Sequence, residues 1–179
     1  MNTPKPVLGF AAFSGTGKTT LLEKLIPLLT AGNIRIGLVK HAHHAFDIDQ
    51  PGKDSYRLRK AGAGQLLIAS SQRTALMTEN AIPQEPRLDE LINRLNLDDI
   101  ELVLVEGFKH VPFPKIELHR KALGKKLLHP EDPDIIAVAS DHPADCNELP
   151  SLDINDTTAI AAFIVAWLDT THGRQGGNQ

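Results

Sequence analysis

The first forty residues switch between two hydrophobic patterns. Residues 7–12 form a short apolar run that ends in a glycine-rich turn, which is typical of a buried strand. Residues 18–30 carry leucine and isoleucine at helical spacing, although Pro27 is expected to kink or shorten this helix. Residues 34–39 form a second apolar run. The order strand, helix, strand favours a parallel sheet with helices packed on its faces.

Further along the chain the same two patterns recur. Two apolar segments, 116–118 and 127–128, flank Gly124, which predicts a β-hairpin extension over about 108–130. The tail 171–179 is polar and glycine-rich and is expected to be disordered. Strands are also predicted at 65–69, 74–77, 100–105 and 135–139, and helices at 54–61, 88–95 and from Asp156 onward.

Residues 12–19 read Ala-Phe-Ser-Gly-Thr-Gly-Lys-Thr and lie between the first strand and the first helix, where a Walker A loop belongs. Gly15 and Gly17 allow positive φ angles, so that successive N–H groups converge on an anion. Lys18 then reaches the β- and γ-phosphates and the Thr19 hydroxyl ligates Mg²⁺. The alternative is a glycine turn with a solvated lysine and threonine. The candidate phosphate-binding residues are Ser14, Gly15, Thr16, Gly17, Lys18, Thr19 and Thr20.

A P-loop site also needs a carboxylate at the end of a neighbouring strand. The run 102–105 is apolar and is followed by Glu106 and Gly107. We expect Glu106 to hold Mg²⁺ together with Thr19, and Gly107 to let the backbone approach the γ-phosphate. Lys18 and Glu106 are the candidate catalytic residues. Aspartate is the usual residue here, so Glu106 could instead be a strand-end carboxylate that faces water.

The densest polar cluster, residues 40–54, follows the second strand at the same edge of the sheet. Lys40 is a candidate phosphate ligand, and Lys53 a candidate for phosphate or substrate. One aspartate, with Asp54 the first choice before Asp47 and Asp49, is expected on Mg²⁺. Asp54 could equally cap a helix.

Three imidazoles in this cluster, His41, His43 and His44, could bind a transition metal. Their spacing matches no standard zinc pattern, so an exposed polar loop is the alternative.

Recognition of the base rests on one weak signal. Asp141 follows the predicted strand 135–139, near the place where GTPases carry Asn-Lys-x-Asp, and could accept both guanine N–H donors. Val138 and Ala139 replace the usual Asn and Lys, so Asp141 could also be a turn residue ahead of Pro143.

Composition narrows the possible partners. The net charge of −3 argues against nucleic acid or an anionic membrane as a partner. No stretch approaches the 18 apolar residues of a membrane span. Cys146 is the only cysteine, which excludes an internal disulfide and favours a cytoplasmic location.

Taken together, these motifs resemble the MobB family of molybdopterin-guanine dinucleotide biosynthesis adapter proteins over residues 7–168. A Val-Glu-Gly strand end with a lysine after the second strand is also similar to dethiobiotin synthetases, in which the glutamate helps hold Mg²⁺. The segments that carry the family resemblance are 10–20, 40–44, 51–55, 59–63, 75–79, 105–110, 136–141 and 152–156.

The resemblance implies a homodimer that binds GTP and Mg²⁺, with weak GTPase activity. It further implies molybdopterin and the guanylyltransferase that joins GMP to it as partners. The segment 108–130, with Lys109, is then a candidate dimer contact. The expected fold is α/β: a three-layer sandwich of the P-loop NTPase type, with a mostly parallel central sheet and the hairpin, in one domain over 1–170. The alternatives are a small-molecule kinase or ligase of the P-loop class and a nucleotide-dependent metallochaperone.

Overall fold

The computed structural model describes residues 3–42, 46–142, 146 and 148–175. Contacts within the chain divide it into two compact units. The core unit comprises residues 1–41 and 87–179, and the insert unit comprises residues 42–86. The prediction of a single domain over 1–170 stays a prediction.

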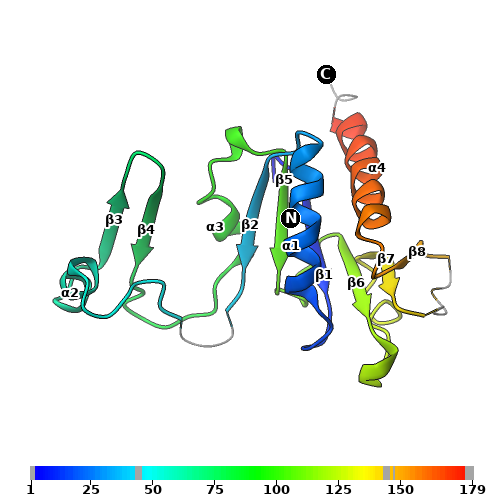
Figure 1. Cartoon of the computed structure of the whole chain (residues 1–179), viewed down its shortest axis with the longest axis horizontal. Helices are drawn as coiled ribbons and strands as arrows, with labels where there is room; N and C mark the ends of the chain where they lie inside the picture. The colour runs from blue at the N-terminus through cyan, green and yellow to red at the C-terminus, as the bar shows by residue number, and fades with distance from the viewer. Residues whose placement is uncertain (1–2, 43–45, 143–145, 147, 176–179) are drawn as a thin grey trace. The chain divides into compact units, whose positions relative to one another are not determined.

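A six-stranded parallel sheet forms the centre of the core unit, with the order β2-β5-β1-β6-β7-β8 (Figure 1). β5 therefore lies between β1 and β2, although it follows them by more than sixty residues in the sequence. The strands are β1 (Val7–Ala11), β2 (Ile36–Lys40), β5 (Leu102–Glu106), β6 (Lys115–His119), β7 (Ile135–Ser140) and β8 (Ser151–Asp153).

Helices cover the sheet because its apolar strands bury side chains on both faces. Leu102 and Leu104 face a cluster formed with α1 (Lys18–Ala31) and α4 (Thr157–Gln175). Val103 and Val105 face the opposite cluster, which receives the side chains of α3 (Leu88–Ile92). Two 3-10 helices, η1 (Leu97–Asp99) and η2 (Lys121–Leu123), lie in the connections. None of the helices in the described ranges combines the length and apolar character needed to cross a membrane.

One face of β6 buries polar side chains. Lys115, Glu117 and His119 alternate with core residues and are at most 9% exposed. Instead of a helix, the segment 125–134 covers them. His119 Nε2 lies 3.0 Å from the Lys125 carbonyl oxygen, and Glu117 accepts the N–H groups of Leu128 (2.7 Å) and His129 (2.9 Å).

Lys115 also holds the covering segment on β6, because its Nζ lies 3.1 Å from Asp132 Oδ2. The same Nζ donates to the Val111 carbonyl at 2.9 Å. The polar side chains of β6 therefore hold the covering segment along the strand, and we call them the β6 polar face.

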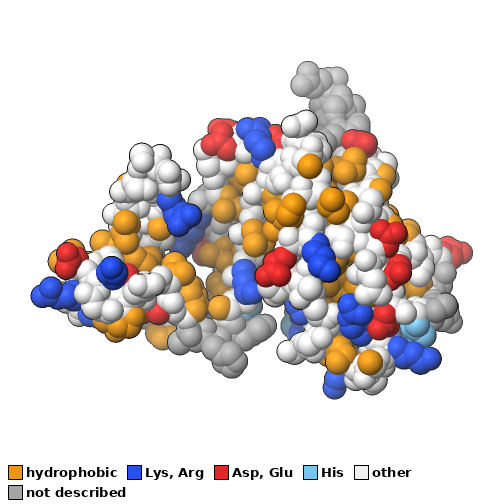
Figure 2. Space-filling view, in the orientation of Figure 1, with side chains coloured by type: hydrophobic (Ala, Val, Ile, Leu, Met, Phe, Trp, Pro, Cys, Tyr) orange, Lys and Arg blue, Asp and Glu red, His pale blue; other side chains and the backbone are white. Residues whose placement is uncertain are grey.

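The insert unit contains α2 (Asp54–Lys60) and the antiparallel pair β3 (Gln65–Ala69) and β4 (Thr74–Thr78). Leu67 lies opposite Leu76, and these side chains are 64% and 60% exposed. No residue of this unit is buried in the ranges that the structure describes, and Figure 2 shows hydrophobic side chains at its surface.

The predicted α/β class, with a mostly parallel sheet and an added antiparallel hairpin, is confirmed. The predicted position of the hairpin, about 108–130, is wrong. Residues 115–119 form a central strand that pairs in parallel with β1 and β7, and the hairpin is β3–β4. The prolines and Gly124 resembled hairpin turns, but they mark loops at either end of this strand.

Three smaller expectations also change. Pro27 lies inside α1 without ending it. Asp54 is the first helical residue of α2 rather than its cap, which is Lys53. Helix α4 continues to Gln175, so the tail expected to be disordered from residue 171 is helical at first, and 176–179 lie outside the described residues.

Candidate functional site

The loop between β1 and α1 contains two glycines in the left-handed backbone region. Gly15 has φ 83° and Gly17 has φ 96°, conformations that L side chains rarely adopt. Thr16 is 2% exposed, and its hydroxyl donates to the Phe13 carbonyl at 2.8 Å, which closes the turn. At Gly17 an added Cβ would meet no atom within 4 Å, so φ rather than space demands glycine there.

Lys18 is the first residue of α1, and its side chain folds back over the loop. Its Nζ donates to the Ala12 carbonyl at 3.2 Å. Burial lowers the pKa of this ammonium group, Glu106 acts in the opposite direction, and Lys109 and Lys40 lower the pKa further. A polyanion would relieve this repulsion between cations.

Glu106 and Lys40 meet at the carboxyl ends of β5 and β2. Glu106 Oε2 lies 3.0 Å from Lys40 Nζ, and the Glu106 side chain is only 15% exposed. Both residues were predicted site residues, and the parallel pairing of β2 with β5 places them opposite each other. The Glu106 carboxylate is therefore mostly buried, has a cation beside it and does not face bulk water.

Gly107 occupies a position that no larger residue fits. Its φ is 97°, and an added Cβ would lie 2.7 Å from His41 Cβ. The His41 ring stacks on Phe108 with centroids 4.8 Å apart, and the His41 N–H donates to the Glu106 carbonyl at 2.9 Å. The turn after β5 is thus fixed against the end of β2.

Asp141 lies at the opposite side of the phosphate loop, directly after β7. Its Oδ1 accepts the Lys121 N–H at 3.0 Å, and its Oδ2 lies 3.6 Å from Arg120 Nη1. The Lys121 N–H lowers the pKa of the Asp141 carboxyl, and the Arg120 charge acts in the same direction. Asp141 is therefore an ionised carboxylate with a fixed orientation.

Sequence reasoning missed Arg120, which donates from Nε to the Thr16 carbonyl at 3.0 Å. The signal was its position after an apolar–polar strand, but that strand had been assigned to a hairpin. Lys125 was missed as well, and its Nζ lies 5.8 Å from the centroid of the Phe13 ring. Figure 2 shows Lys and Arg side chains gathered around the end of β6 and η2.

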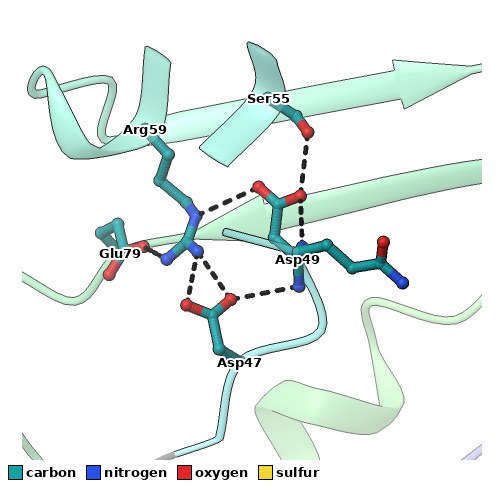
Figure 3. Close-up of polar contacts among 6 residues, drawn as sticks. Asp47, Asp49, Ser55, Arg59 and Glu79 are labelled. Carbon is teal, nitrogen blue, oxygen red and sulfur yellow. Dashed lines mark hydrogen bonds and ion pairs between the residues drawn. The ribbon is translucent and has the colours of Figure 1, made fainter. Parts of the chain in front are cut away.

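Other predicted residues lie in the insert unit. Lys53 and Asp54 flank the start of α2, and their roles at phosphate and Mg²⁺ stay predictions. Figure 3 shows that Asp47 and Asp49 surround Arg59. Arg59 Nη2 donates to Asp47 at 2.6 Å and Nη1 donates to Glu79 at 2.6 Å.

These contacts give the carboxylates of the insert unit a structural partner. The hydrogen bond from Arg59 lowers the pKa of Asp47, and Asp49 Oδ1 accepts the Ser55 hydroxyl at 2.8 Å. His43 and His44 lie outside the described residues. In the part of the chain that the structure describes, no group of three or more His, Cys, Asp or Glu side chains could hold a metal ion.

The donor set of the core unit fits a nucleoside polyphosphate with a divalent cation. The helix start and the ammonium of Lys18 suit phosphate oxygens. The carboxylate of Glu106 and the exposed hydroxyl of Thr19 are oxygen ligands of the kind that Mg²⁺ prefers. Ser14 and Thr20 are exposed beside them.

Comparison with known proteins gives consistent matches. Residues 7–141 match the family profile described as MobB, molybdopterin guanine dinucleotide synthesis protein B. The chain is 52% identical to the molybdopterin-guanine dinucleotide biosynthesis adapter protein of Escherichia coli K12, covering 94% of this chain and 96% of that protein. A protein of the same description from Haemophilus influenzae is 47% identical, covering 97% and 95%. The crystal structure of Bacillus subtilis MobB has the same fold, with a TM-score of 0.69 at 23% identity, covering 89% of this chain and 96% of that one.

Proposed function

Because the chain belongs to the MobB family, we propose that it is an adapter in molybdopterin guanine dinucleotide biosynthesis that binds GTP and Mg²⁺. The observation that carries the proposal is the meeting of three groups at one edge of a parallel sheet. These are the glycine loop, the ammonium of Lys18 and the carboxylate of Glu106, which is paired with Lys40. Open α/β sheets bind ligands at this edge.

Each residue has a distinct part in the proposed site. Lys18 and the loop N–H groups balance the phosphate charge, with Lys40 as a second cation that a phosphate can draw from Glu106. Glu106 and Thr19 would hold Mg²⁺, which supplies charge neutralisation between the phosphates when it is bound. Asp141 is the proposed acceptor for the guanine N–H donors.

We propose that hydrolysis of GTP is slow. The arginine that contacts the phosphate loop, Arg120, is engaged with the Thr16 carbonyl and the Asn155 side chain, and we propose that no arginine among the described residues is placed to stabilise the transferring phosphoryl group. Lacking such an arginine costs about 10³–10⁵ in rate. Slow turnover suits an adapter, whose nucleotide-bound state must last while molybdopterin and the guanylyltransferase are engaged.

Titration calorimetry with GTP and ATP in the presence of Mg²⁺ tests the nucleotide assignment. Lys18→Ala is expected to lower GTP affinity by at least about 100-fold, since a desolvated charge–phosphate contact is lost. Lys24→Ala removes an exposed lysine from the same helix and should leave affinity unchanged. Equal affinities for the wild type and Lys18→Ala would refute the phosphate site.

We also propose that the protein is a homodimer whose contact lies in the insert unit. The family resemblance implies a contact in the segment 108–130, but β6 within it is paired on both sides and presents no edge. The β3–β4 pair, in contrast, leaves Leu67 and Leu76 exposed. A two-stranded sheet with one apolar face exposed is marginally stable in water, so a second chain over this face would stabilise it.

A further inference from the structure

Arg120 connects three loops at the carboxyl edge of the sheet. It follows β6, which lies between β1 and β7. Its Nε donates to the Thr16 carbonyl in the phosphate loop at 3.0 Å. Its Nη1 lies 3.6 Å from Asp141 Oδ2 after β7, and its Nη2 donates to Asn155 Oδ1 after β8 at 3.3 Å. One planar guanidinium thus serves acceptors from three separate segments.

The contact with Thr16 fixes the direction of a peptide group. In a planar trans peptide the carbonyl oxygen and the following N–H point in opposite directions. Holding the Thr16 carbonyl therefore aims the Gly17 N–H away from Arg120. Gly17 lies in the left-handed region at the start of α1, where the alternative orientation of this peptide is sterically open to glycine. Arg120 removes that freedom.

Asp141 and Asn155, the other two partners of Arg120, lie on the side of the sheet opposite to Glu106 and Lys40. Glu106 and Lys40 lie on the β5 and β2 side of β1, whereas Asp141 and Asn155 lie on the β7 and β8 side. If the proposed function holds, a nucleotide with its terminal phosphate beside Glu106 would extend its base toward β7 and β8. Arg120 stands between the two ends.

We propose that Arg120 is a positioning residue that couples the phosphate loop to the base end of the site. It orients the Thr16–Gly17 peptide and the Asp141 carboxylate at the same time, so phosphate affinity and base discrimination depend on one side chain. Lysine does not replace it, because an ammonium lacks the flat fork that reaches three acceptors. This proposal rests on the proposed nucleotide function.

Titrations with inorganic tripolyphosphate, GTP and ATP, each with Mg²⁺, test both halves of the proposal. Arg120→Gln and Arg120→Lys are each expected to lower tripolyphosphate affinity by about tenfold or more, since charge-assisted hydrogen bonds are lost. Both variants should also bring the ratio of GTP to ATP affinity close to one. Lys121→Gln removes a neighbouring exposed charge and is expected to change neither quantity by more than about threefold.

A double-variant cycle measures the coupling itself. The double variant Arg120→Gln/Asp141→Asn should have a ratio of GTP to ATP affinity no smaller than that of Arg120→Gln alone. The second substitution adds no loss because Asp141 has already lost its orientation. Wild-type tripolyphosphate affinity in Arg120→Gln would overturn the role in the phosphate loop. Equal GTP and ATP affinity in the wild type, or full additivity in the cycle, would overturn the coupling to the base.

Hydrogen exchange of the nucleotide-free protein separates this proposal from the proposed function. Arg120→Gln is expected to speed exchange of the Lys121 and Thr16 amides, which are bonded to Asp141 and Phe13, by about tenfold or more. The Ile160 amide of α4, bonded to the carbonyl of Asp156 just before this helix, serves as the internal control. Unchanged exchange would overturn the positioning role even in a protein that binds GTP. Faster exchange in a protein that binds no nucleotide would refute only the proposed function.

Discussion

Lys18 shows how burial and neighbouring charge act on a single functional side chain. Its pKa is lowered by burial, while Glu106 opposes the shift. Because only the ammonium form attracts phosphate, affinity for tripolyphosphate should fall as pH rises through this lowered pKa, below the pH at which an ordinary lysine titrates. Binding should restore the higher pKa, so protons are taken up. Calorimetry in two buffers of different ionisation enthalpy measures the uptake, and proton release on binding would contradict it.

Glu106 is predicted to matter for the metal ion more than for the nucleotide. Glu106→Gln keeps the shape of the side chain but removes the charge that a hard cation prefers. We expect the Mg²⁺-dependent gain in GTP affinity to fall by about tenfold, while affinity measured in EDTA changes little. Glu23→Gln, on the exposed side of α1, is the control. An equal loss with and without Mg²⁺ would show that Glu106 acts through its contact with Lys40.

For single residues, the sequence was sufficient where the role of a residue follows from its neighbours along the chain. The phosphate loop was predictable because Gly15, Gly17 and Lys18 lie between one strand and one helix. The placement of Lys40 and Glu106 at one edge of the sheet followed from two strand ends, whereas the ion pair between them was not predicted. Arg120 was not predictable, because its acceptors come from distant segments and its own strand had to be placed first.

Among the elements, β6 departs furthest from its sequence pattern. Alternating Lys115, Glu117 and His119 resemble the solvent face of an edge strand, yet all are buried. Most of their partners lie in the covering segment 125–134, which no local rule connects to this strand. The three-residue strand β8 is too short to produce a hydrophobic period, whereas the long apolar runs of β1, β5 and β7 were predicted correctly.

We expect the β6 polar face to contribute to the free energy of unfolding. Glu117→Ala leaves two N–H groups, of Leu128 and His129, without their acceptor. Because each unpaired buried group costs about 1–3 kcal/mol, the free energy of unfolding should fall by roughly 2–5 kcal/mol. Glu131→Ala, which removes an exposed ion pair with Lys126 in the same segment, should cost less than about 1 kcal/mol. Urea titrations compare the two, and equal losses would mean that the polar face adds no stability.

For the whole molecule, the proposed assembly depends on the insert unit. Leu76→Lys places a charge on the exposed face of β4, opposite Leu67. If a second chain covers this face, the variant should sediment as a monomer at concentrations where the wild type is a dimer, because burying an unpaired ammonium is costly. Leu28→Lys, at an exposed position on α1 in the core unit, should remain dimeric. A dimeric Leu76→Lys would place the contact elsewhere.

The position of β5 between β1 and β2 has a consequence for the nascent chain on the ribosome. Neither β1 nor β2 has a strand partner until residues 102–106 have been synthesised, since both pair with β5. At translation speeds of about 5–20 residues per second, these strands wait for roughly 3–13 seconds after β2 is complete. During that interval the apolar residues 7–11 have no sheet to join, so a pause in translation ahead of residue 102 would prolong the time when aggregation competes with folding.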